Sequence, residues 1–480
     1  MKKRHILALI LPLTFTQAFA AIEPEIYVGG MMNFNYLMTD QDSNYSQEFL
    51  PVGFNSSSNA NNLSDDVLYA QDAYIDVLAL GREDNGFLYG GKVTMQLNSE
   101  RQHNYTYNTS GEKTESENNV AVGVRRSFVF LEKKSFGRFE FGNTEGPSKK
   151  MKFDAGYKFG GTGGISGDWW RYVNIPDFYL TYSDTVDTVG DSTASSDVQD
   201  RDGSGNKGFI IRPDSPLSHG YTPEYGAYKI DDTLTISRIA YYSPRISNLQ
   251  FGLSYAPDSN QRGSSYYGEG FSDNGDVTDV IDWGVNYVQQ FTNDFGLAAS
   301  YTGELGYAED AGVLYTDAFV QKDLFAHNVG FYAFKGNFNF SASLGSWGDS
   351  LMFVREDLTS SSSQYRDTDA SYTTFGLGYQ FGAYKVSFAN MSSSYRQQDF
   401  SLTSIAFDYR MTKNLNLYAE INSYEFDVYA DDEDTDISDG VTVAQSMDNS
   451  GSVILLGIKL TFGGFDNASS VLLDTSAANY

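Results

Sequence analysis

The chain has 480 residues, a formal net charge of −29 and no cysteine. This acidic balance excludes partners that need a basic surface, such as nucleic acid or an anionic lipid face. Without cysteine the fold cannot be stapled by disulfides, so its stability must come from burial and backbone pairing.

Residues 1–20 have the layout of a cleavable signal peptide. A basic start is followed by an apolar stretch from Ile6 to about Phe15 and by Ala-Phe-Ala at 18–20. The apolar stretch is too short for a membrane anchor, and no later segment offers about twenty consecutive apolar residues. Export followed by a transmembrane helix is therefore excluded, and a closed β-barrel is the remaining way to span a membrane.

Two-residue alternation of apolar and polar side chains recurs along the rest of the chain. It is clearest at residues 87–98, where Phe, Tyr, Val, Met and Leu alternate with Gly, Lys, Thr, Gln and Asn. The same pattern appears after Gly29 and at 249–255, 281–291, 297–305, 338–344, 373–381, 403–411, 415–421 and 451–462. A soluble sandwich would bury the apolar face, whereas a membrane barrel turns it toward lipid. The export signal and the 15% aromatic content favour the barrel.

The connections between these segments set the number of strands. Seven are short and carry turn residues, at 81–86, 133–137, 243–248, 292–294, 335–337, 381–383 and 412–414. Eight are long and polar, at about 38–66, 99–119, 143–235, 257–278, 306–322, 347–370, 392–399 and 425–449. They predict an all-β, up-and-down antiparallel barrel of about 16 strands over residues 21–462, too wide for side chains to fill and therefore water-filled.

Three stretches resemble the general porins of Gram-negative bacteria. Residues 125–146 resemble their fourth hairpin, and residues 236–258 resemble the strand, Ser-Pro turn and strand that follow the third loop. Gly457, Leu460 and Phe462 match the assembly signal of outer-membrane proteins. The resemblance implies a homotrimer in the cell outer membrane, reached through the periplasm, that contacts lipid and the barrel-assembly machinery. It also implies an inward-folded third loop and passive diffusion of small hydrophilic solutes.

Two features depart from that family. A polar tail, residues 463–480, follows the terminal aromatic residue. The segment 143–235 is longer than an inward loop requires.

Alternation and the resemblance predict which charged residues line the passage. The basic wall consists of Lys92, Arg125 and Arg238, with Arg125 at the position of the porin wall arginine, whereas Arg126 is expected to face the other way. The loop acids are Glu145, Asp154 and Asp168, near a flexible GGTGG at 160–164. Asp282, Glu304, Asp408 and Glu420 are expected on the lumen face, and their number predicts a mild preference for cations.

Metal binding and catalysis are the weaker hypotheses. Asp200, Asp202, Ser204 and Asn206 resemble the first half of a calcium loop, but Ile211 stands where a bidentate acid is required, so no metal is predicted. His103, His219 and His327 lack a Gly-x-Ser-x-Gly nucleophile turn, so neither an enzyme nor a cofactor is predicted. The alternative function is an adhesin or receptor barrel that acts through its long surface loops.

Overall fold

The computed structural model describes residues 23–42, 67–97, 103–107, 113–117, 122–156, 159–173, 179–180, 200–201, 209–219, 236–259, 277–308, 319–351, 353–355, 370–395, 398–427 and 449–463. The predicted signal peptide and the tail beyond Gly463 lie outside these ranges, as do most of the long connections.

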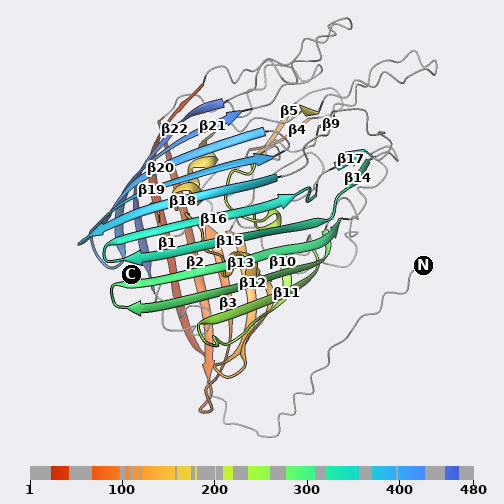
Figure 1. Cartoon of the computed structure of the whole chain (residues 1–480), viewed down its shortest axis with the longest axis vertical. Helices are drawn as coiled ribbons and strands as arrows, with labels where there is room; N and C mark the ends of the chain where they lie inside the picture. The colour runs from red at the N-terminus through yellow and green to blue at the C-terminus, as the bar shows by residue number, and fades with distance from the viewer. Residues whose placement is uncertain are drawn as a thin grey trace, which may run out of the picture.

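Sixteen antiparallel strands form one closed barrel, as the sequence predicted (Figure 1). They are β1 (Glu25–Gln41), β2 (Val67–Arg82), β3 (Phe87–Leu97), β6 (Val122–Lys133), β7 (Gly137–Thr144), β10 (Ile236–Tyr242), β11 (Leu249–Asp258), β12 (Val277–Thr292), β13 (Phe295–Ala308), β15 (Leu324–Lys335), β16 (Phe338–Gly348), β18 (Ala370–Phe381), β19 (Tyr384–Tyr395), β20 (Gln398–Arg410), β21 (Leu415–Asp427) and β22 (Asn449–Phe462). Each pairs with the next, and β22 pairs with β1 to close the ring.

Smaller elements occupy the long connections. Three two-stranded sheets pair β4 (His103–Tyr107) with β5 (Lys113–Glu117), β8 (Tyr179–Leu180) with β9 (Asp200–Arg201), and β14 (Phe319–Gln321) with β17 (Phe353–Arg355). The helical turns are α1 (Pro147–Lys150), η2 (Gly164–Ser166), η3 (Asp168–Tyr172) and α2 (Pro216–His219). Within the described ranges, no helix has the length and apolarity needed to cross a bilayer.

The seven short turns fall where the sequence predicted them, but one long connection does not. Residues 392–399 were expected to form a loop, yet β19 and β20 stay paired as far as Tyr395 and Gln398. The Ser-rich ends of both strands continue the ladder, Ser392 opposite Ser401, because a paired strand can rise beyond an apolar band with polar side chains on its outer face.

The strands expose their apolar face and bury their polar one. On β11, Leu249, Phe251 and Leu253 are exposed, while Gln250 and Ser254 between them are buried. A soluble β protein would show the reverse. The predicted assignment of faces, apolar outward and polar inward, is therefore confirmed.

Gly457 has a structural role at the seam of the barrel. The ring of Tyr418, on β21, lies over this glycine so closely that a Cβ there would sit 2.0 Å from ring atom Cζ. The Tyr418 hydroxyl then donates to Asn33 Oδ1 of β1 at 2.7 Å. A glycine on β22 thus lets β21 reach across to β1 and tie the first strand to the last two.

Candidate functional site

Three stretches of the connection between β7 and β10 lie against the inward faces of the strands. They are residues 145–156, 159–173 and 209–219, called here the inner segments. α1 contacts β11, β12 and β13, whereas η2 contacts β19, β20 and β21. Their yellow turns are enclosed by the barrel strands in Figure 1.

Asp282 of β12 holds the first turn of the inner segments. The Ser148 backbone N–H donates to Asp282 Oδ1 at 2.6 Å, and the Ser148 hydroxyl donates to Oδ2 at 2.9 Å. Arg238 Nη1 also donates to Oδ2, at 2.9 Å. All three side chains are buried, so this acid binds the chain that crosses the lumen instead of facing water.

The same kind of contact continues along the crossing. Inward side chains accept four successive backbone N–H groups: Phe153 to Ser300 Oγ (2.9 Å), Ala155 to Thr374 Oγ1 (3.4 Å), Gly160 to Ser387 Oγ (3.2 Å) and Thr162 to Glu420 Oε1. These acceptors belong to β13, β18, β19 and β21. A buried backbone amide needs a hydrogen-bond acceptor. The polar side chains of the inner wall supply these acceptors to a loop that has no regular secondary structure of its own.

Glycines let the backbone of the inner segments approach the wall. A Cβ on Gly330 of β15 would lie 1.7 Å from the Phe153 carbonyl oxygen, and one on Gly376 would lie 2.9 Å from the Phe159 ring. The predicted freedom of the GGTGG stretch is also present, because Gly160 and Gly163 have φ of 83° and 126°, which favour glycine.

The third inner segment, 209–219, is fixed in the same way. The Leu217 backbone N–H donates to Glu304 Oε1 at 2.7 Å. The Trp347 indole N–H donates to the Asp214 carbonyl at 2.8 Å, and the Ser393 hydroxyl donates to the Ile210 carbonyl at 2.7 Å. Residues far from the first crossing in sequence thus share the same inner wall.

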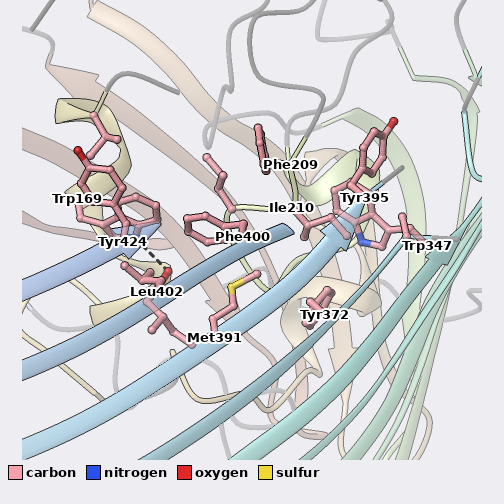
Figure 2. Close-up of a cluster of buried hydrophobic side chains, with 14 of the residues drawn as sticks. Trp169, Phe209, Ile210, Trp347, Tyr372, Met391, Tyr395, Phe400, Leu402 and Tyr424 are labelled. Atoms are coloured by element: carbon pink, nitrogen blue, oxygen red, sulfur yellow. Dashed lines mark hydrogen bonds between the residues drawn. The ribbon is translucent and has the colours of Figure 1, made fainter. Parts of the chain in front are cut away.

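A hydrophobic core forms between the inner segments and the wall (Figure 2). Trp169 stacks on Phe400 of β20 with ring centroids 5.7 Å apart and lies 6.0 Å from Tyr424 of β21. Phe209 meets Phe426 edge-on at 4.9 Å. The expectation of a lumen filled by water is therefore wrong for this part of the barrel, because aromatic side chains on both sides exclude water from it.

The predicted lumen acids point inward but have different surroundings. Asp282, Glu304 and Glu420 are buried beneath the inner segments that they bind. Asp408 is half-buried and stands opposite Lys385 across the β19–β20 pair.

The predicted basic wall is partly brought together. Lys92 Nζ lies 3.1 Å from Asp76 Oδ2 of β2. Arg238 is buried with Asp282, away from these two residues in the ring of strands.

The expectation that Arg126 faces outward is wrong. A bulge in β6 shifts the register between Thr94 and Met95 of β3, so Arg126 stands opposite the inward, buried Thr94. Such a bulge re-aims side chains without breaking the ladder. Alternation counted along an unbroken strand could not reveal it.

The predicted loop acids also have basic partners. Glu145 pairs with Arg126, and Asp154 lies 2.9 Å from Lys152. Burial alone would raise the pKa of Glu145, but the positive charges of Arg126, Lys149, Lys150 and Arg125 lower it to about 2. Asp168, in η3, is half-buried beside Gly167 and Trp169.

Partly accessible residues of the described inner wall gather on β2, β3 and β6, with a smaller set, Lys385, Asp408 and Lys459, on β19, β20 and β22. From β10 to β16 the inward residues are buried almost throughout. By contrast, six inward residues on β2, β3 and β6 are half-exposed: Asp72, Tyr74, Lys92, Gln96, Arg125 and Arg126. This group, called here the charged wall, is the candidate site.

Sequence reasoning missed Asp72, Tyr74 and Arg126 of the charged wall, and Asp76 and Lys149 beside it. Asp76 follows the inward parity of β2 and could have been found by extending the alternation over residues 69–81. Lys149 gave no signal, since its position depends on the path of α1.

The remaining predicted sites carry less information. Asp200 lies in β9, whereas Asp202, Ser204 and Asn206 fall outside the described ranges, and within those ranges no acidic or histidine cluster could hold a metal. His327 faces outward and packs edge-on against Tyr301, with centroids 6.1 Å apart.

Comparison with known proteins adds the following. A family model described as Gram-negative porin matches residues 8–429. Uncharacterized proteins of Rickettsia bellii and Rickettsia conorii are 24% and 22% identical, covering 64% and 82% of this chain and 71% and 84% of theirs. The solved structure of an anion-selective porin from Comamonas acidovorans is 14% identical, with a TM-score of 0.52, over 92% of this chain and 100% of that one.

Proposed function

This chain belongs to the Gram-negative porin family, and from that premise we propose that it forms a channel for passive diffusion of small hydrophilic solutes and ions. The family consists of channels of the outer membrane rather than enzymes. One observation carries the proposal: the inward polar residues of β2, β3 and β6 keep access to water, whereas the inward residues from β10 to β16 are covered.

The proposed constriction lies between this wall and the start of the inner segments. Lys92, Arg125 and Glu145 are its proposed members from the sequence prediction, joined by Asp76 and Arg126. Opposed charges in a narrow aqueous passage set a local field that filters solutes by charge and size.

The predicted mild cation preference loses its main support. It was predicted from four lumen acids together with acidic loops, and three of those four acids are buried against the inner segments and so do not face a solute. Cation preference is therefore not part of the proposed function.

Assembly is also proposed from the family. Export would remove residues 1–20, the barrel-assembly machinery would read Gly457, Leu460 and Phe462, and three copies would associate in the lipid. Small outward residues on β2 and β3, such as Ala79 and Gly91, support a flat contact face there.

Planar-bilayer recording of the purified protein tests the proposed function. We expect steady ionic currents that fall as sugars of increasing size fill the passage. A protein that gives no current but binds cells would refute the channel and support the adhesin or receptor alternative. The variant Arg125→Ala should raise the single-channel conductance, because it removes a bulky side chain from the proposed constriction.

A further inference from the structure

Three ion pairs around the charged wall share an asymmetry, whereas Arg126 and Glu145 are almost equally exposed, at 23% and 21%. In each of the three, the basic side chain is more exposed than its acidic partner: Lys92 against Asp76, 23% and 11%; Lys149 against Asp214, 34% and 5%; Lys150 against Glu140, 16% and 1%. At these three pairs a solute therefore meets ammonium groups before carboxylates. Asp72, the half-exposed acid of the charged wall, accepts a hydrogen bond from Gln96 Nε2 at 3.5 Å.

Each of these three carboxylates has a further hydrogen-bond donor besides its lysine, which helps to keep it less exposed than the lysine. Asp76 also accepts a hydrogen bond from the Thr94 hydroxyl of β3, and Asp214 is also bound by Lys152. Glu140 accepts from Arg138 Nε at 2.8 Å and from the Thr144 hydroxyl at 3.0 Å. Each carboxylate is thus neutralised or hydrogen-bonded from the wall side, and its exposed partner contributes positive potential to the lumen.

The β6 bulge adds two more cations at the same place. Arg126 pairs with Glu145, and Arg125, the next residue, also acts on that carboxyl. One carboxylate, Glu145, is therefore surrounded by four positive charges, which together lower its pKa to about 2 against the effect of burial.

Two acids of the inner segments stand beside these cations and are paired with them, Glu145 with Arg126 and Asp214 with Lys149. The other two lie elsewhere. Asp154 is buried with Lys152. Asp168 acts on Glu420 and Tyr418 of β21, away from β3 and β6 in the ring of strands. The positive potential therefore stays local to the charged wall.

We propose that Lys92, Lys149, Arg125 and Arg126 form an anion-binding stretch of the passage, so that the channel prefers small oxyanions, with inorganic phosphate or a carboxylate as the class of solute. This preference opposes the net charge of −29 of the whole chain, because exposed loop charges are screened by salt whereas charges inside a narrow lumen act at short range. The inference rests on the proposed channel function.

The test is the reversal potential in a KCl gradient across a planar bilayer, for the full-length mature protein. We expect chloride to be more permeant than potassium, and added inorganic phosphate to reduce the chloride current. Removing one unit charge about 7 Å from the path of an ion in water changes its local concentration about threefold. Lys92→Met and Lys149→Met should each shift the permeability ratio toward potassium by at least that factor and weaken the effect of phosphate.

These two variants keep the buried acids paired, since Asp76 retains Thr94 and Asp214 retains Lys152. The matched control is Lys335→Met, which removes an exposed lysine at the short turn after β15 and should leave the ratio unchanged. Heat-modified gel mobility confirms that each variant has folded. Potassium preference in the unmodified protein, or unchanged ratios in both lumen variants, would overturn the inference. Complete absence of current would instead refute the channel.

Discussion

Gly330 marks a point where a single residue decides how close the inner segments come to the wall. It faces the lumen from β15, and the Phe153 carbonyl occupies the space in which a side chain would begin. The neighbouring Phe153 N–H donates to Ser300 on the next strand of the barrel. The N–H of Phe153 is therefore positioned by the Ser300 hydroxyl and its carbonyl by the space above Gly330. A Cβ added at Gly330 would force the backbone at Phe153 to move.

Gly330→Ala should displace the inner segments, at an overpacking cost of about 1–3 kcal/mol. We expect faster trypsin cleavage after Lys149, Lys150 or Lys152 and an altered single-channel conductance. The control is Gly123→Ala on β6, where nothing lies within 4 Å of the added carbon. Equal cleavage rates in the two variants would contradict this account of the close approach.

The inner segments are held as an element by their own hydrophobic core as well as by hydrogen bonds. Trp169, fully buried, is one of two buried tryptophans in that core and stacks between strand residues of β20 and β21. Its indole N–H donates to the Ile165 carbonyl at 3.2 Å, so the ring also closes the turn from η2 to η3. Packing fixes the element where regular secondary structure does not.

Trp169→Ala should loosen this element without opening the barrel, because it leaves the strand ladders intact. Removing a buried Trp side chain costs about 3–5 kcal/mol. We expect rapid proteolysis within 145–173 and noisy currents, with the heat-modified gel shift of the folded barrel retained. Trp170→Ala, at a half-exposed neighbouring position, is the control and should have a smaller effect. Loss of the gel shift would show that the barrel depends on this core.

For the whole molecule, the outer surface differs around the ring. Large apolar side chains such as Phe251, Leu253 and Phe325 are exposed on β11 and β15. The outward face of β2 instead carries Ile75, Val77 and Ala79, and that of β3 carries Gly91 and Val93. Small residues allow two barrels to approach closely, whereas long apolar side chains suit lipid.

Ala79→Trp should therefore weaken the proposed trimer, since a bulky ring would separate the faces in contact. Light scattering of the detergent-solubilised protein should give a mass of three chains for the unmodified protein and a lower mass for the variant. Ala299→Trp, at an outward alanine of β13, should leave the mass unchanged. The same mass for both variants would place the subunit contact elsewhere.

The sequence by itself determined the barrel. Strand pairing needs only a period of two and a turn at each end, and both are local, so the sixteen strands, their faces and the seven short turns could be predicted. The position of Lys92 beside an acid of the neighbouring strand follows from the same parity. The bulge that turns Arg126 inward could not be predicted from the sequence, because it arises from a mismatch of register between β3 and β6.

Only the tertiary structure decided what the inward residues do. Asp282, Glu304, Glu420 and Asp408 all have inward parity. The first three bind the inner segments, whereas Asp408 stands opposite Lys385. The difference depends on the path of a connection through the lumen, and that path is set by contacts between residues 87 or more positions apart. Alternation specifies the face of a side chain, but the hydrogen-bond partner on that face is fixed by packing.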